Sequence, residues 1–158
     1  MPTMNWSLQN KMPTFPPLSA NDPIREVIKQ AFDMALPVEG GWGYTKKEAL
    51  ILHPHTMPTQ QLQHTLASMR THLEMSMTRP EGERYGGINL TEEHREADAA
   101  YQKVTYRVTA MLESDYTAFI AAYKAGYGTD DFDMEAHFHA RKEATYKQNI
   151  AVWFQTQN

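Results

Sequence analysis

The chain has 158 residues and a formal net charge of −4 at pH 7, from 15 lysines and arginines and 19 aspartates and glutamates. It contains no cysteine, which excludes disulfide bonds, thiolate catalysis and thiolate zinc sites. The acidic balance and the absence of long basic runs argue against nucleic acid as a partner, and no apolar run reaches the ~20 residues that span a bilayer. We therefore expect a cytoplasmic protein that does not bind membranes.

Residues 1–20 are rich in proline and polar residues and show no apolar periodicity. They predict an extended N-terminal arm, followed by one globular domain over residues 21–158. Wholly disordered tails are poor in aromatic residues, so we expect the isolated apolar residues of this arm, among them Trp6 and Phe15, to dock on the domain or on a second copy of it.

The first helix is predicted over residues 22–36, because Asp22 can cap a helix whose first position is Pro23. Pro37 is expected to end it. A second helix is predicted after Pro58, where apolar residues recur at helical spacing.

Three glycines surround Trp42 in residues 38–44. They indicate either an exposed aromatic platform for a partner or a tight turn with Trp42 packed inward, and the turn is the favoured interpretation. The apolar run of residues 49–52, bounded by these glycines and by His53, predicts a short buried strand.

Around residue 73 the apolar period changes to two. Residues 73–78 are therefore predicted to form a strand, with Leu73, Met75 and Met77 on one face. Residues 84–89 are expected to return as its antiparallel partner after a turn at residues 80–83.

The longest apolar pattern covers residues 89–123, where apolar side chains recur three or four apart. It predicts a helix that begins near Asn89 or Thr91, followed by a second helix that begins at Ser114 or Asp115 and stops at Gly126, with one continuous helix as the alternative. The apolar residues of the first segment are Ala97, Ala100, Tyr101, Val104, Val108, Met111 and Leu112.

A last helix is predicted over residues 134–154, capped by Asp133, with Ile150, Trp153 and Phe154 on its inner face. Together these elements predict an α+β fold. It has a small, mainly antiparallel sheet of about three strands packed under several helices, and its C-terminal half is rich in helix.

Two histidine pairs suggest a metal site. His53 and His55 stand in His-Pro-His, and His137 and His139 stand in His-Phe-His. Side chains two residues apart point the same way only in extended backbone, so the second pair would need a strand where we predict a helix. If the two pairs converged, they could bind a divalent transition metal, the one cofactor that the sequence suggests.

The neighbouring acidic run, residues 130–135, lacks the glycine and the final glutamate of an EF-hand and is expected to cap the last helix. Elsewhere the sequence shows no phosphate loop, dinucleotide fingerprint or nucleophile elbow. The favoured hypothesis is therefore a non-catalytic protein-interaction or ligand-binding module that self-associates or binds a protein partner. The partner-binding candidates are Trp42, Tyr44, Trp153 and Phe154, because aromatic residues are common at interfaces.

The alternative hypothesis is a small metal-dependent hydrolase. In it, the two histidine pairs would bind the metal, and Asp131 or Glu135 would act as the base that removes a proton from metal-bound water.

Overall fold

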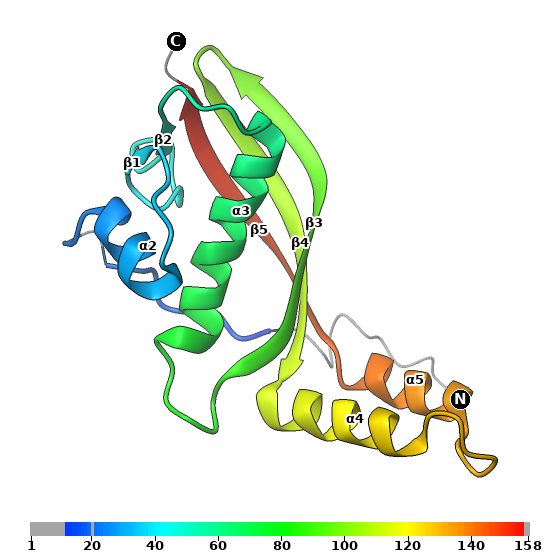
Figure 1. Cartoon of the computed structure of the whole chain (residues 1–158). Coiled ribbons are helices and arrows are strands. Elements are labelled where there is room, and N and C mark those ends of the chain that lie inside the picture. Colours follow the sequence, from blue (N-terminus) through cyan, green and yellow to red (C-terminus); the bar gives the residue numbers. More distant parts are fainter. Residues whose placement is uncertain (1–11, 20, 157–158) are drawn as a thin grey trace.

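The computed structural model describes residues 12–19 and 21–156 (Figure 1). Five strands form one mixed sheet in the order β1-β2-β5-β4-β3, with β5 in the centre. β5 runs parallel to β2 and antiparallel to β4, and the other neighbouring pairs are antiparallel. The strands are β1 (Val38–Gly40), β2 (Leu50–Leu52), β3 (Tyr85–Asp98), β4 (Tyr101–Leu112) and β5 (Tyr146–Thr156).

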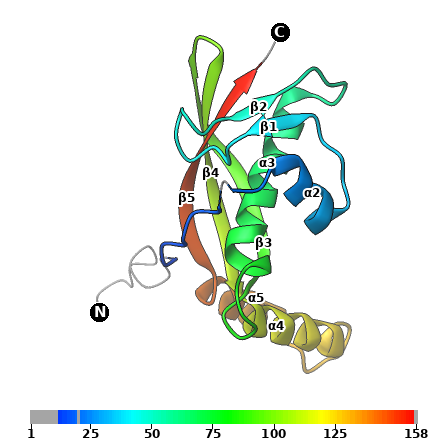
Figure 2. The same cartoon turned by 90° about the vertical axis from the view of Figure 1, so that its left-hand side faces the viewer.

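The helices lie on one face of the sheet and at one end of it. α2 (Ile24–Phe32) and α3 (Thr59–His72) lie on the same side of the sheet, as Figures 1 and 2 show. α3 continues into a π-helix, η1 (Leu73–Met77). α4 (Glu113–Gly126) and α5 (Met134–Glu143) form the end of the molecule that extends away from the sheet.

The core lies between the sheet and α3. Alternate residues of the two central strands are buried, because successive side chains of a strand point to opposite faces. On β4 and β5 the alternating buried set is Val104, Tyr106, Val108, Ala110, Ile150, Val152 and Phe154, and Met111 near the end of β4 is buried as well. We call this the inner face, and the face with Thr105, Arg107 and Thr109 the outer face.

The α+β class is confirmed, but the prediction of about three strands and a helix-rich C-terminal half is wrong. The first predicted helix of residues 89–123 is instead the long hairpin of β3 and β4. Val104 and Val108 are four residues apart, which fits one face of a helix and also one face of a strand. The turn consists of Ala99 and Ala100 only, and Ala99 adopts a left-handed φ of 56°. Without glycine or asparagine, the sequence carries no hairpin signal there.

The last predicted helix is correct only in its first half. α5 ends at Glu143, and residues 146–156 form β5, which is the central strand. Ile150 and Phe154 do share a face, but as alternate residues of a strand, so the intervening buried residue is Val152 rather than Trp153.

The predicted strand at residues 73–78 is also wrong, because the chain continues from α3 as a π-helix. The backbone N–H and the hydroxyl of Thr78 both donate to the carbonyl of Leu73, at 3.1 Å and 2.6 Å. Residues 84–89 do enter a strand, β3, but its partner is β4.

The helices with strong local start signals are confirmed. α3 follows Pro58 and buries Leu62, Leu66 and Met69. α2 follows Pro23. It ends at Phe32, before Pro37, because Asp33 adopts a left-handed backbone conformation with a φ of 54°. The predicted buried strand at residues 49–52 corresponds to β2.

The part of the N-terminal arm that the structure describes packs on the domain, with Met12 and Phe15 buried in the core. Trp6 lies outside the described residues.

Candidate functional site

The most exposed apolar surface belongs to α4 and α5, which form a helical hairpin (residues 113–143) that projects from the sheet (Figure 1). None of the 14 residues of α4 is buried. Five large apolar side chains are exposed among the described residues, and three of them are on the hairpin: Tyr127 at 64%, Phe138 at 46% and Met134 at 40%. Contiguous exposed apolar patches are typical of interaction surfaces, which makes the hairpin the candidate site.

The hairpin is held together by an aromatic cluster. The ring of His137 is buried, with its centroid 5.3 Å from that of Phe132, 5.7 Å from that of Tyr123 and 5.8 Å from that of Phe119. Asp133 caps α5, since its carboxylate accepts a 3.0 Å hydrogen bond from the N–H of Ala136. These contacts hold α4 and α5 together, so the relative position of their outer surfaces is set within the folded chain.

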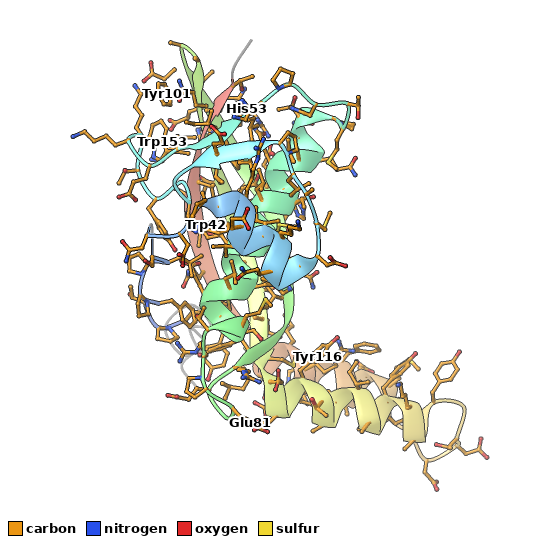
Figure 3. The ribbon with its side chains drawn as sticks, turned by 60° about the vertical axis from the view of Figure 1, so that its left-hand side comes forward. Trp42, His53, Glu81, Tyr101, Tyr116 and Trp153 are labelled. Atoms are coloured by element: carbon orange, nitrogen blue, oxygen red, sulfur yellow. The ribbon has the colours of Figure 1, made fainter. Side chains whose placement is uncertain are left out.

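Tyr116 fixes the hairpin to the sheet (Figure 3). Its ring lies against Gly86 and Gly87 of β3, at the base of the hairpin. Gly87 has a φ of +59°, and a Cβ atom placed there would lie 2.7 Å from Cδ1 of Tyr116. Only glycine allows both the backbone conformation and the close approach.

We expect Gly87→Ala to lower the free energy of unfolding by about 2 kcal/mol, from left-handed strain and displacement of the Tyr116 ring. Urea denaturation measures this loss. Gly128→Ala is the control, because Gly128 also has a positive φ but nothing lies within 4 Å of its added Cβ. Equal losses for the two variants would show that the contact with Tyr116 contributes nothing.

A groove of about 460 Å³ lies where the hairpin meets the sheet. Asn89 and Thr109 line it from the sheet, and Tyr116, Phe138 and Arg141 line it from the hairpin. Its two charged lining residues, Arg141 and Lys142, are both basic. Two more basic residues lie beside the groove on the outer face of the sheet. Lys147 of β5 is opposite Thr109, and Arg107 precedes Thr109 by two residues on β4. The charged lining of the groove is therefore basic.

The opposite end of the hairpin is acidic. Residues 127–135, which we call the tip, include four carboxylates and no lysine or arginine. The carboxylates are Asp130, Asp131, Asp133 and Glu135, and all four residues are exposed. Among the described residues, none of the four makes an ion pair.

A buried charged network lies inside the domain, around Arg70. The Arg70 guanidinium donates to the carbonyl oxygens of Trp42 and Ala151, at 3.2 Å and 3.3 Å, and stacks on the ring of Tyr44 at 4.4 Å. Its Nε lies 3.9 Å from Oε1 of Glu74, which is an ion-pair distance rather than a hydrogen bond. The hydroxyl of Tyr44 donates to Oε2 of Glu74 at 2.5 Å and accepts from the N–H of Leu18.

These contacts shift the pKa values of the group. Burial raises the pKa of the Glu74 carboxyl, and Arg70 acts against that rise. Burial likewise raises the pKa of the Tyr44 hydroxyl, with a further contribution from its hydrogen bond to Glu74. Perturbed groups of this kind occur at active sites and in structural networks alike. In this network the charged groups connect the N-terminal arm, the turn after β1, α3 and β5. We therefore assign the network a structural role.

The two histidine pairs do not come together. His53 and His55 follow β2 in the body of the domain, whereas His137 and His139 lie on α5 in the projecting hairpin. His53 Nε2 is 3.2 Å from Glu39, and His139 Nε2 is 2.6 Å from Glu143. Asp131 and Glu135 are at the tip. Within residues 12–19 and 21–156, no group of three histidine, aspartate or glutamate side chains is placed to hold a metal ion.

The four aromatic residues proposed for partner binding lie in different environments. Trp42 and Phe154 are 3% and 0% exposed and belong to the core, so neither can contact a partner of the folded chain. Trp42 thus has the inward position of the favoured turn interpretation (Figure 3). Tyr44 is half-buried and is engaged by Glu74 and Arg70.

Trp153 is the one of the four on the outer face. It is half-buried, and Nζ of Lys103 lies 5.8 Å from its ring. Nearby, Lys46 lies over the ring of Tyr101 and forms a 2.5 Å ion pair with Asp98. This end of the outer face carries charges of both signs.

No helix in the described part of the chain has both the length and the apolar character needed to cross a membrane. Comparisons of the chain with models of protein families, with curated proteins and with solved structures find no match.

Sequence reasoning missed the helical hairpin as a site. Its apolar residues recur at the spacing of a packed helix face, which predicts burial rather than exposure. One signal was present: a glycine stop at Gly126 and an Asp133 cap lie close together, which is typical of a short connection between two antiparallel helices.

Proposed function

We propose that the protein is a self-associating protein-interaction module and that the helical hairpin carries its contact surface. The observation that supports this proposal is the exposure of Tyr127, Met134 and Phe138 on a hairpin whose first helix buries none of its residues. The two helices of the hairpin also pack on each other through the His137 cluster, and Tyr116 holds the hairpin against the sheet. A preorganised apolar surface loses little conformational entropy on binding.

The proposal predicts that the wild-type chain forms a complex larger than a monomer at tens of micromolar concentration. Tyr127→Ser combined with Phe138→Ser should weaken this association by about a hundredfold, because burying each side chain contributes roughly 1.5 kcal/mol or more and about 1.4 kcal/mol is a factor of ten. Size-exclusion chromatography with light scattering over a concentration series measures the change.

The matched control is Met34→Ser combined with Met77→Ser. These two side chains are also large, apolar and exposed, at 40% and 47%, but they lie outside the hairpin. The control should associate like the wild type. A wild-type chain that stays monomeric throughout the series would contradict the proposal.

A further inference from the structure

The tip of the helical hairpin and the lining of the groove at its base carry opposite charges. We infer that two copies of the chain pair their hairpins antiparallel, so that the tip of each docks into the groove at the base of the other. This inference rests on the self-association proposed above. It adds the identity of the partner, a second copy, and the two surfaces that meet.

The tip and the groove differ in charge. The tip carries four carboxylates and no cation, and the groove is lined by Arg141 and Lys142 with Arg107 beside it. Arg107 is exposed and makes no ion pair within the described part of the chain. Glu143, two residues after Arg141 on α5, contacts His139 at 2.6 Å. Complementary charges of this kind select a partner and fix its orientation.

The tip of one chain is too far from the groove of the same chain to contact it. The tip and the groove of one chain lie at opposite ends of α4, and a 14-residue helix is about 21 Å long. Because the hairpin is fixed to the sheet through Tyr116, the tip cannot fold back into the groove of its own chain. A second copy is needed to bring the two surfaces together.

Exposed apolar and small side chains lie on the hairpin between the tip and the groove. Met134 and Phe138 are one helical turn apart on α5 and both exposed, so they form an apolar stripe that leads from the tip to the groove. Ala118, Ala122 and Ala125 of α4 are also exposed, and small side chains allow helices to approach closely. Antiparallel pairing would cover this surface along its length.

Symmetry then defines the product. If the tip of one hairpin lies at the base of the other, a twofold axis places the second tip at the first base. The contact is therefore made twice and the assembly closes as a dimer.

Charge reversal at each end tests the inference. Asp130→Lys combined with Asp131→Lys changes the tip, and Arg107→Glu combined with Arg141→Glu changes the groove. Each variant alone should dimerise about a hundredfold more weakly than the wild type, because like charges then face each other. An equimolar mixture of the two should recover dimers, since the reversed tip and the reversed groove are again complementary. Sedimentation velocity measures both effects.

Glu26→Lys combined with Lys29→Glu is the control, because both residues are exposed on α2, away from the hairpin. It should leave the dimer unchanged. If the wild type is a dimer but the two charge variants and their mixture behave like it, the inference fails and self-association stands. If the wild type is monomeric, the proposed function fails as well.

Crosslinking gives a measurement that does not depend on weakened binding. The chain has no cysteine, so Thr129→Cys at the tip and Asn89→Cys at the groove, both at exposed positions, introduce the only thiols. Mixed and oxidised, these two single-cysteine chains should form a covalent dimer faster than either does alone. Equal rates in the mixture and in the separate samples would overturn the antiparallel arrangement.

Discussion

Arg70→Met is expected to lower the free energy of unfolding by about 3–5 kcal/mol, the usual cost of removing one partner from a buried ion pair. Arg70 is 3% exposed, and its loss leaves the buried Glu74 carboxylate without its cation. The carbonyl oxygens of Trp42 and Ala151 lose a donor at the same time. Urea denaturation at neutral pH measures the change.

The loss should shrink in mildly acidic buffer. Burial raises the pKa of Glu74 and Arg70 opposes that rise, so the pKa of Glu74 in the folded variant lies further above its value in the unfolded chain. A carboxyl shifted in this direction favours folding below its unfolded pKa, and this contribution is lost as the pH rises through the folded pKa. The variant is therefore least stable, relative to the wild type, when Glu74 is ionised.

Two further variants separate the ion pair from the general effect of removing an arginine. Arg25→Met, at an exposed position of α2, should change stability by less than about 0.5 kcal/mol. Combining Arg70→Met with Glu74→Met should restore part of the loss, because no unpaired charge then remains in the core. A single Arg70→Met variant as stable as Arg25→Met would show that the network does not stabilise the fold.

Truncation after Asn149 is expected to abolish folding. The deleted segment contains most of β5, including Ile150, Val152 and Phe154, which are buried. Each such side chain contributes roughly 2 kcal/mol by burial. Because β5 lies between β2 and β4, its loss also removes the hydrogen bonds that join these two strands into one sheet. The sum is comparable to the whole stability of a small domain, about 5–15 kcal/mol.

Circular dichroism and thermal denaturation test the truncation. The shortened chain should lack a cooperative transition, whereas a chain that ends at Thr156 keeps β5 and should melt like the wild type. A cooperative transition at the wild-type temperature in the shorter chain would show that the sheet does not depend on β5.

The sequence predicted the elements whose signals are local. Pro23, Pro58 and Asp133 each mark a helix start that the structure contains, because proline and aspartate at the N-terminus act within one turn of the chain. The strands β3, β4 and β5 depend on partners far away in sequence. Their stability comes from cross-strand packing, which no window of a single sequence reports.

The candidate site was predicted poorly for a related reason. Residue type correctly marks aromatic side chains as suited to interfaces, but only tertiary structure decides which are exposed. Trp42 and Phe154 became core residues, while Tyr127 and Phe138 became the exposed ones. The histidine pairs failed to meet because one of them lies on α5 in the projecting hairpin.

The central place of β5 also affects how the domain forms during synthesis. β5 leaves the ribosome after every other described strand, yet it joins β2 on one side to β4 on the other. Until it arrives, the β3 and β4 hairpin has an open inner edge, which can pair with other nascent chains. We therefore expect folding to be completed late and the unfinished chain to need protection by chaperones. Once β5 has paired with β2 and β4, the open edge is covered and this protection is no longer needed.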